Sequence, residues 1–581
     1  MCGILGANIS NKEVVREAID LFSYRGPDST GIFSDKEVTF GFKRLAIIDL
    51  DQRSNQPMQY KHITVIFNGE IYNYKILKAE LEKTYTFQTD SDTEVIIFAY
   101  MKWGTDMVSR LKGMYAISLY DAEKKKVYLF RDHVGIKPLY YYHKDDLFIF
   151  ASEVKGVTKV LKSLNKKVDV DRGMLDFYYC LGYIPTPHSL YKNIFRLPAK
   201  TILEYDLIDH KISANTFGVQ TENASTIEEL KLLLEEKTKQ HLNSDVPVGL
   251  FFSGGTDSSV IAAILKKHNV KLENFSIEMS HKKEDKEFFT NISKHLNIKS
   301  NVYKFGDTEF DQVYSKVMNK LDEPFVDASV FPTYYVSKQA AKKVKVVLSG
   351  EGGDEYFYGY ARHKTLYSLR NKADYKMTWL DNLYFGLPKF KQKNYLFKIL
   401  FRLNQQPLSF YLASKSIGKD LVFWAKCKKE MEKQQLKPLE IDKKLYLENV
   451  LLRKIDLATS YNSIEGRVPL LDIDFIQSSD NFEDKKLEEG QLKAPLKEIL
   501  CSYLPKNLVY RGKSGFGVDM RHQFKRSAQL KEDYAKAVEY LKKRDLLPRK
   551  FKKSNPEWYL SRVPNFCFSI IVLYYTLKYH K

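Results

Sequence analysis

The sequence predicts two domains of different class, a strand-rich α+β domain over residues 1–205 and an α/β domain with a parallel sheet over residues 226–581. Three observations support this fold class. The first part contains short apolar strand patterns with few helices, and the second repeats a strand, a glycine-rich loop and a helix. In addition, 581 residues exceed what one core supports. The polar, patternless residues 206–225 are expected to form a linker.

Five segments of the first part have the alternating or fully apolar pattern of β-strands. They are residues 39–48, 63–67, 114–120, 127–131 and 139–142. Among them, Ser91 and Glu94 have the spacing of a capping box, in which a hydroxyl and a carboxylate accept amides at a helix N-terminus. A helix is therefore expected to begin near Asp92.

The second part opens with a similar box, Ser225 and Glu228, ahead of a helix that runs towards Gln240. Buried strands over residues 248–252 and 344–348 then enter glycine-rich loops. This order is typical of a parallel sheet that binds ligands at its carboxyl edge. The rest of the chain is predicted to be mostly helical.

Composition excludes several classes of protein. The apolar run over residues 566–577 is shorter than the ~20 residues that cross a bilayer, so we expect a buried C-terminal helix and no membrane partner. The net charge of +20 comes from dispersed lysines with acids close by, which favours a solvated surface over a nucleic-acid partner. A local field that attracts ATP or an anionic acceptor is the alternative.

Cysteine usage and the N-terminus indicate a cytoplasmic protein. The five cysteines are scattered without CxxC spacing, which argues for a reducing compartment and against a zinc site. The N-terminus has no signal-peptide pattern.

Cys2, directly after the initiator methionine, is the first candidate catalytic residue. Removal of the methionine would give a thiol and an α-amine on one residue, a nucleophile with its own base. Asn68 and Gly69 would suit an oxyanion hole, and Arg44 and Asp92 would suit the charged ends of an α-amino acid. Singly, Asn68-Gly69 is more often a hairpin turn and Asp92 a helix N-terminal acid. Only their combination with Cys2 suggests a site.

The loop over residues 253–259 (SGGTDSS) is predicted to bind phosphate. Gly254 and Gly255 allow backbone N–H groups to point at an anion, and the following helix N-terminus adds partial positive charge. Asp257 would be repelled by bare phosphate, so it is interpreted as a ligand for Mg²⁺ carried with the nucleotide. The alternative is a Gly-Gly turn capped by Asp257 and Ser258, and the spacing is not that of a Walker A loop.

A second loop over residues 349–355 (SGEGGDE) brings three acids together after a buried strand. Asp354 could share the Mg²⁺ with Asp257, and Glu351 could act on an acceptor or on its activated form. The alternative is an acidic surface turn.

In this order along essentially the whole chain, the motifs resemble those of the glutamine-dependent asparagine synthetase family. The resemblance implies an N-terminal-nucleophile glutaminase domain, an αββα sandwich, over residues 1–205 and an ATP-pyrophosphatase-type synthetase domain over residues 226–581. The motifs are CGI (2–4), YRGPD (24–28), RLAIID (44–49), NGEIYN (68–73), SDTE (91–94), SGGTDSS (253–259), LSGEGGDE (348–355), SIEGRVPLLD (463–472) and RGKSGF (511–516).

By this resemblance, Cys2 attacks the side-chain amide of glutamine, with its own α-amine as base and with Asn68 and Gly69 holding the oxyanion. The residues expected to bind glutamine are Arg44, Asn68, Glu70 and Asp92. Ammonia would pass through an internal channel to the second site.

At that site, the resemblance implies that an acceptor carboxylate attacks the α-phosphorus of ATP, and that ammonia then displaces AMP from the acyl-adenylate. Lys493 would assist adenylation, Glu351 would be catalytic, and Asp257 and Asp354 would bind Mg²⁺. ATP or pyrophosphate would contact Leu250, Ser253, Gly254, Gly255, Asp257, Ser258, Ser259, Ile277, Ser349 and Gly350. The implied partners are glutamine, ATP and aspartate or another carboxylate, and a homodimer is compatible with the family.

Departures from the family pattern leave the acceptor open. Thr256 stands where leucine is usual, Lys497 replaces an arginine, Gly466 replaces a small apolar residue, and residues 278–287 match poorly. The favoured acceptor is aspartate, and a nucleotide-linked uronic acid of surface polysaccharide synthesis is the alternative. A non-catalytic relative that keeps the fold is less favoured, because the expected catalytic and metal-binding residues are all present.

Overall fold

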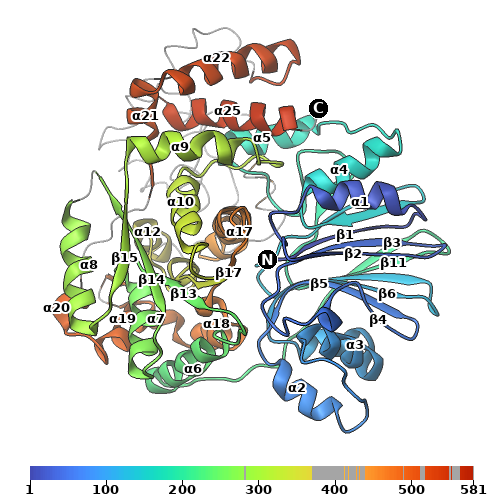
Figure 1. Cartoon of the computed structure of the whole chain (residues 1–581). Helices are drawn as coiled ribbons and strands as arrows, with labels where there is room; N and C mark the ends of the chain where they lie inside the picture. Colours follow the sequence, from blue (N-terminus) through green and yellow to red (C-terminus); the bar gives the residue numbers. More distant parts are fainter. Residues whose placement is uncertain are drawn as a thin grey trace.

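The computed structural model describes residues 1–280, 283–368, 439–488, 490–510, 517–548 and 563–579, with single residues between these ranges. Two halves lie side by side, the blue-to-cyan amino half on the right of Figure 1 and the green-to-red carboxyl half on the left. The RGKSGF motif at 511–516 lies outside the described residues.

The amino half contains two six-stranded antiparallel sheets that pack face to face. One has the strand order β10-β8-β9-β1-β3-β2 and the other β12-β11-β7-β6-β5-β4. Apolar side chains of both sheets, such as Ile4, Phe150 and Leu203, fill the space between them. The strands are β1 Gly3–Ala7, β2 Ser29–Ser34, β3 Thr39–Arg44, β4 Met58–Tyr60, β5 Ile63–Ile71, β6 Gly113–Asp121, β7 Lys126–Arg131, β8 Tyr140–Lys144, β9 Leu147–Ala151, β10 Ile194–Arg196, β11 Thr201–Asp206 and β12 Ile212–Thr216.

Helices cover the outer faces of both sheets. Helices α1 (Lys12–Asp20) and α4 (Val154–Ser163) pack on the first sheet, and α2 (Tyr74–Leu81) and α3 (Asp92–Trp103) pack beside the second. These four layers confirm the αββα sandwich. All five predicted strands are present, although the first of them ends at Arg44.

Helix α3 begins at Asp92 as predicted, and the hydroxyl of Ser91 accepts an amide of its first turn. The predicted capping box is not closed. The carboxylate of Glu94 instead accepts the backbone amides of Gln88 (3.0 Å) and Thr89 (2.7 Å). Glu94 is therefore engaged by the preceding loop, whereas in a closed box its carboxylate would accept the backbone amide of Ser91.

Part of the expected linker is a strand. β12 pairs with β11 at the edge of the second sheet, and four of its five residues are exposed. Because burial does not select apolar residues on such an edge, the strand leaves no apolar alternation in the sequence. The next helix, α6 (Ile227–Gln240), is capped by the closed box of Thr226 and Glu229, one residue after the predicted pair.

The carboxyl half contains a five-stranded parallel sheet of order β15-β14-β13-β16-β17, as predicted. Strand order reverses between β13 and β16, the position at which open α/β sheets bind ligands. Both glycine-rich loops leave the sheet there, because one follows β13 and the other follows β16. The strands are β13 Val248–Phe251, β14 Glu273–Met279, β15 Ser300–Phe305, β16 Val346–Leu348 and β17 Glu465–Arg467.

Helices make up most of the remaining described chain. A π-helix over Asp442–Leu451 runs directly into α17 (Leu452–Ser460). The other helices are α5 Arg172–Leu181, α7 Thr256–Lys267, α8 Lys283–Leu296, α9 Asp307–Met318, α10 Val330–Ala340, α11 Gly353–Tyr356, α12 Ala361–Ser368, α18 Ile473–Ser479, α19 Ala494–Cys501, α20 Lys506–Val509, α21 Met520–Arg526, α22 Ala528–Lys543 and α25 Pro564–Tyr579.

Helix α25 confirms the predicted C-terminal helix. It packs against α22, its central residues Ile570 and Leu573 are fully buried, and the hydroxyl of Tyr178 donates to the carbonyl of Ser569 (2.6 Å). Among the described helices, none is both long and apolar enough to cross a membrane.

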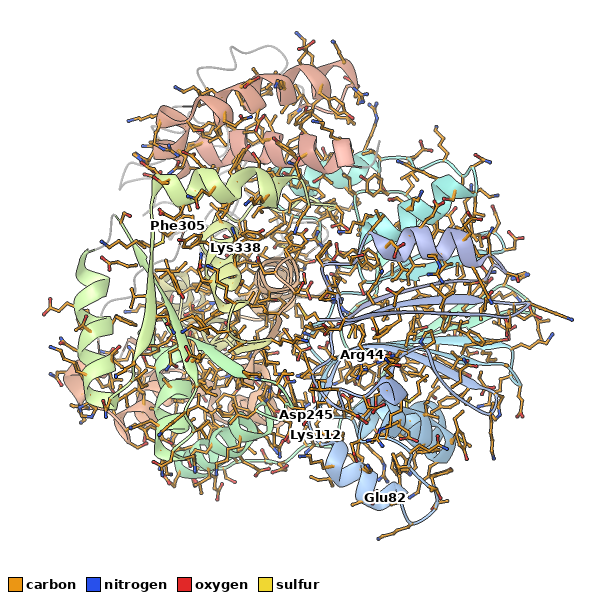
Figure 2. All side chains as sticks on the ribbon, in the orientation of Figure 1. Arg44, Glu82, Lys112, Asp245, Phe305 and Lys338 are labelled. Carbon is orange, nitrogen blue, oxygen red and sulfur yellow. The ribbon has the colours of Figure 1, made fainter. Side chains whose placement is uncertain are left out.

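The two halves meet across a layer of ion pairs, most of them buried. In Figure 2, Lys112 and Asp245 lie at this boundary, and Lys112 pairs with Asp474 of the carboxyl half (2.8 Å). Asp245 reaches back to the amino half, where its carboxylate accepts the amide of Asp49 (2.8 Å). Further pairs across the boundary are Arg25–Asp456, Arg131–Glu448 and Arg467–Glu70.

Candidate active sites

Cys2 precedes β1, and the N-terminus lies between the two halves of the molecule (Figure 1). The thiol is 3.9 Å from the carbonyl oxygen of Leu45, to which it donates. Burial raises the pKa of this thiol above its usual value. The thiol therefore needs a nearby base to become a nucleophile at neutral pH.

A chain amine placed here would be such a base. Met1 is only 1% exposed, and burial lowers the pKa of its α-amine to about 5. An amine in these surroundings is neutral at pH 7 and can accept a proton. Removal of Met1 would put the amine on Cys2 itself, beside the thiol, as the catalytic prediction requires.

Asn68 and Gly69 lie within β5, where they pair with Ala116 and Tyr115 of β6, and do not form a hairpin turn. Asn68 is fully buried, and neither polar atom of its amide has a hydrogen-bond partner among the described residues. A buried donor without a partner is costly, and an oxyanion would satisfy it. A Cβ on Gly69 would lie 2.0 Å from the carbonyl oxygen of Met114, so only glycine fits there.

Two further candidate residues of this site, Asp92 and Glu70, are buried acids. Asp92, at the start of α3, accepts the amide of Ile71 (3.1 Å), and burial raises its pKa to about 7. Glu70 lies one residue before Ile71, and burial likewise raises the pKa of its carboxyl. The structure thus brings Asn68, Glu70 and Asp92 together at the end of β5.

Arg44 has a different surrounding. One terminal nitrogen donates to the carbonyl of Asp51 (2.8 Å) and to the side chain of Asn55 (2.9 Å), and the other donates to the carbonyls of Ile48 and Asp49. Arg44 therefore holds the loop after β3, and its terminal nitrogens are already engaged there. Its expected contact with glutamine stays a prediction.

Arg467 of the carboxyl half completes this region and was not given a role from the sequence. It is fully buried in β17, and its guanidinium donates to Glu70 (2.8 Å), to Glu465 (2.9 Å) and to the carbonyl of Asn243 (2.6 Å). Its own carbonyl accepts the amide of Ser349 (2.8 Å), the first residue of the second loop. The sequence did contain a signal for this buried ion pair, because Glu465 and Arg467 stand among apolar residues in the motif over residues 463–472.

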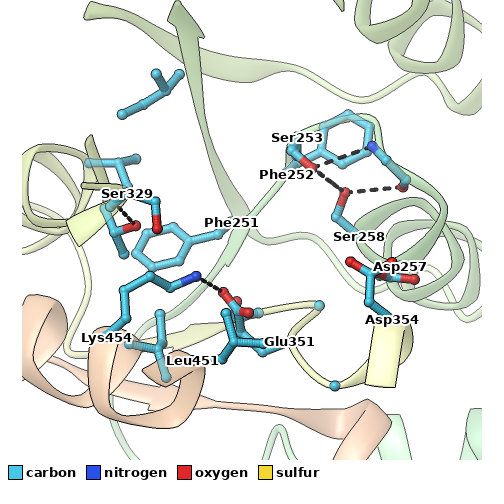
Figure 3. Close-up of a pocket in the computed structure, with 18 of the residues that line it drawn as sticks. Phe251, Phe252, Ser253, Asp257, Ser258, Ser329, Glu351, Asp354, Leu451 and Lys454 are labelled. Carbon is cyan, nitrogen blue, oxygen red and sulfur yellow. Dashed lines mark hydrogen bonds and ion pairs between the residues drawn. The ribbon is translucent and has the colours of Figure 1, made fainter. Parts of the chain in front are cut away.

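The second site is a cavity of about 410 Å³ at the carboxyl edge of the parallel sheet, beside α10 and α17 (Figure 3). Leu250 and Ser259 are fully buried and do not line it. Gly254 belongs to the same loop, in which it has a φ of 71° that favours glycine. The predicted residues that line the cavity are Ser253, Gly255, Asp257, Ser258, Ile277, Ser349, Gly350, Glu351 and Asp354.

The two loops touch each other, and glycines make this approach possible. A Cβ on Gly350 would lie 2.9 Å from the amide nitrogen of Ser258, and a Cβ on Gly353 would lie 2.5 Å from a carboxylate oxygen of Asp257. The amino end of α7 is therefore held directly against the second loop.

Lys493 lies between the two acids predicted to bind metal. Its ammonium is 2.6 Å from Oδ2 of Asp257 and 2.6 Å from Oδ1 of Asp354. Although burial opposes it, the charge of these two carboxylates raises the pKa of Lys493. Lys493 has a φ of 59°, in the left-handed region that is uncommon for a lysine.

Two carboxylates that converge on one cation are the oxygen ligands that Mg²⁺ prefers. Among the described residues, no group of three or more acids, histidines or cysteines could hold a metal ion alone. This donor set fits a cation that also binds the phosphates of a nucleotide.

Comparisons with known proteins identify the family of both halves. The family model described as "Glutamine amidotransferase domain" matches residues 1–217, and the one described as "Asparagine synthase" matches residues 229–554. The chain belongs to the glutamine-hydrolysing asparagine synthetase family. Residues 1–217 and 229–554 are called its amidotransferase and synthase domains below.

The relatives of this family are similar along most of the chain. Asparagine synthetase 1 of Bacillus subtilis is 31% identical, with 90% of this chain and 88% of that protein covered. An asparagine synthetase homologue of Methanocaldococcus jannaschii is 37% identical over 64% of this chain and 77% of its own length. Asparagine synthetase B of Escherichia coli is 31% identical over 62% of this chain and 65% of its own length.

The synthase cavity also contains charged residues that the sequence analysis missed. Lys454, on α17, pairs with Glu351 (2.8 Å), and Asp327, just before α10, lines the same cavity. Figure 3 shows Lys454 and Glu351 on one side of the cavity and Asp257 and Asp354 on the other. These residues lie outside the glycine-rich motifs, so only the fold brings them to the site.

Helix α17 links the two domains. Asp456, two residues after Lys454, binds both terminal nitrogens of Arg25 (3.1 and 3.0 Å). Arg25 is fully buried, and its Nε donates to the carbonyl of Cys2 (3.1 Å). One helix thus connects the backbone of Cys2 to the wall of the synthase cavity.

Proposed function

We propose that this protein takes the amide nitrogen of glutamine at Cys2 and uses it to convert aspartate to asparagine, with ATP and Mg²⁺. The observation that carries this proposal is that one chain holds two separate regions, an amino half with the half-buried Cys2 thiol and the unsatisfied Asn68 amide, and a loop-lined cavity with acids and a lysine. Membership of the asparagine synthetase family supports the same reaction.

In the amidotransferase domain, Cys2 attacks the side-chain carbonyl carbon of glutamine. The α-amine of processed Cys2 takes the thiol proton and returns it to the leaving ammonia. The Asn68 amide and the Gly69 backbone N–H hold the oxyanion, and Asp92 and Glu70 bind the ammonium end of glutamine. Water then releases glutamate from the thioester, and ammonia moves to the synthase domain.

In the synthase domain, the β-carboxylate of aspartate attacks the α-phosphorus of ATP, and pyrophosphate leaves. The loop over residues 253–259 holds the pyrophosphate with its amides and its helix N-terminus, and Lys493 donates to the developing charge. Asp257 and Asp354 would hold Mg²⁺, which when bound would neutralise phosphate charge. Ammonia attacks the acyl carbon of the β-aspartyl-AMP, and AMP leaves.

A mixture of the protein with glutamine, Mg-ATP and aspartate tests this proposal directly. We expect asparagine and AMP in equal amounts. Glutamate release without asparagine would contradict the aspartate assignment, and nucleotide-linked uronic acids would then be the next acceptors to supply. Absence of any pyrophosphate-forming reaction would contradict the proposed ligase chemistry.

A further inference from the structure

The synthase cavity has two chemically distinct ends. At one end are the phosphate loop, Asp257 and Asp354, and at the other are Lys454 and Glu351 (Figure 3). Asp327 also lines this cavity. The first end is accounted for by ATP and its cation in the proposed function. The second end faces the remaining substrate, so its charges should reveal the chemistry of the acceptor.

Lys454 provides positive charge at the acceptor end. Its side chain is 7% exposed, and its ammonium lies 2.8 Å from Oε1 of Glu351. Among the described residues that line the cavity, Lys454 is the only cation. A single buried ammonium suits one carboxylate of a ligand, and it offers little to an acceptor that carries a diphosphate.

Asp327 provides negative charge at the same end, because it binds Ser329, which Figure 3 shows on the Lys454 side of the cavity. Its Oδ1 accepts both the amide (2.9 Å) and the hydroxyl (2.7 Å) of Ser329, which fixes the carboxylate. Oδ2 has no hydrogen-bond partner within the described part of the chain. Because Asp327 and Lys454 come from different elements yet line the same cavity, they can bind opposite charges of one small molecule.

We propose that Lys454 and Asp327 select an α-amino dicarboxylic acid as acceptor, Lys454 binding its α-carboxylate and Asp327 its α-ammonium. The second carboxylate of the acceptor is then left to react at Glu351 and the α-phosphorus. This inference rests on the proposed function and deepens it, because it assigns the acceptor to named residues. It also accounts for the Lys454–Glu351 pair, which holds the lysine in place until the acceptor carboxylate arrives.

Two analogues of aspartate separate the two contacts. Succinate lacks the α-ammonium, and 3-aminopropanoate lacks the α-carboxylate, while both keep a carboxylate that can be adenylated. Pyrophosphate release is measured with the full-length protein, Mg-ATP and free ammonia, so that the Cys2 reaction is bypassed. We expect the wild type to prefer aspartate over both analogues.

Lys454→Gln should raise the KM for aspartate on the order of 100-fold, the loss expected for a charged hydrogen bond, and should bring aspartate and 3-aminopropanoate close to parity. Asp327→Asn should remove the discrimination against succinate instead. In both variants the KM for ATP should change less than about twofold. Lys454→Arg should keep the preference for aspartate over 3-aminopropanoate.

Lys338→Gln is the matched control, because Lys338 lies on α10 but does not line the cavity (Figure 2). Glutamine hydrolysis at Cys2 reports folding of each variant. If Lys454→Gln fails to fold, the behaviour of Asp327→Asn still tests the inference, because this variant should lose its discrimination against succinate. Unchanged acceptor preferences in folded variants would overturn this inference alone, whereas a wild type that ignores aspartate but adenylates another carboxylate would overturn the proposed function.

Discussion

At the scale of single residues, burial decides the protonation state of acidic side chains in the amidotransferase domain. Asp92 has a pKa of about 7 because it is removed from water, so near neutral pH its carboxyl changes between a neutral and a charged form. Only the charged form binds an ammonium strongly. Glutamine should therefore bind better as pH rises.

We expect kcat/KM for glutamine hydrolysis to rise about tenfold between pH 6 and pH 8, with an apparent pKa near 7. The sign follows from the raised pKa, since the carboxylate is protonated below it and ionised above it. The control substrate is 4-carbamoylbutanoate, which lacks the α-ammonium and should not show this component of the rise. An identical profile for both substrates would assign the ionisation to another group.

Cys2→Ala tests the separation of the two reactions. It should abolish asparagine formation from glutamine but leave formation from free ammonia, because the second site needs only the amine. Asp257→Ala should abolish synthesis with either nitrogen source while glutaminase activity remains. Intact-mass analysis must show that Met1 is removed in the wild type. Loss of the ammonia reaction in Cys2→Ala would contradict two independent sites.

Many candidate residues were predictable because they lie in short motifs with their own local chemistry. Cys2, Asn68 and Asp257 belong to this group, and the fold holds Asp257 and Asp354 against Lys493. Arg467, Lys454 and Asp327 were given no role, because the need for each depends on a partner more than 100 residues away or on a cavity wall. Sequence spacing contains no information about such pairs.

At the scale of elements, burial decided which predictions succeeded. The strands of the two sandwich sheets and of the parallel sheet were predictable because their side chains must be apolar. The exposed strand β12 was not predictable in this way. The predicted capping box at α3 is open because the preceding loop engages Glu94, and the box at α6 lies one residue after the predicted pair. The capping-box patterns predicted the first residues of α3 and α6 to within one position. They did not predict which hydrogen bonds cap these two helices.

Helix α17 carries the sharpest prediction at this scale. Asp456→Asn should weaken the pairing of buried Arg25, lower stability by about 3 kcal/mol and reduce glutaminase activity more than ammonia-dependent synthesis. The reason is that Arg25 also holds the carbonyl of Cys2. Chemical denaturation and the two activities measure this effect.

Glu539→Gln on α22 is the matched control for Asp456→Asn, because Glu539 belongs to an exposed pair with Lys543. It should leave the denaturation midpoint and both activities unchanged. An equal response of the two variants would show that the Arg25–Asp456 pair has no special role.

At the scale of the whole molecule, buried ion pairs hold the two domains together. Arg467 and Glu70 are at most 3% exposed in their side chains, so salt should screen this pair little. We therefore expect one cooperative unfolding transition for both domains, insensitive to moderate salt.

Arg467→Gln should separate that transition into two and raise the KM for glutamine, because the buried Glu70 carboxylate loses its charged partner. Differential scanning calorimetry between 0.1 and 0.5 M NaCl measures the first effect. A single transition with an unchanged KM in this variant would contradict the coupling of the domains through this pair.

The Glu70–Arg467 contact also has a consequence for synthesis on the ribosome. The two residues are 397 positions apart in the chain. At ~5–20 residues per second, translation of this interval takes on the order of 20–80 s. During that time the nascent amidotransferase domain lacks Arg467, which contacts Glu70 of the proposed glutamine site. We expect it to release little ammonia until the domain that consumes the ammonia has also been made.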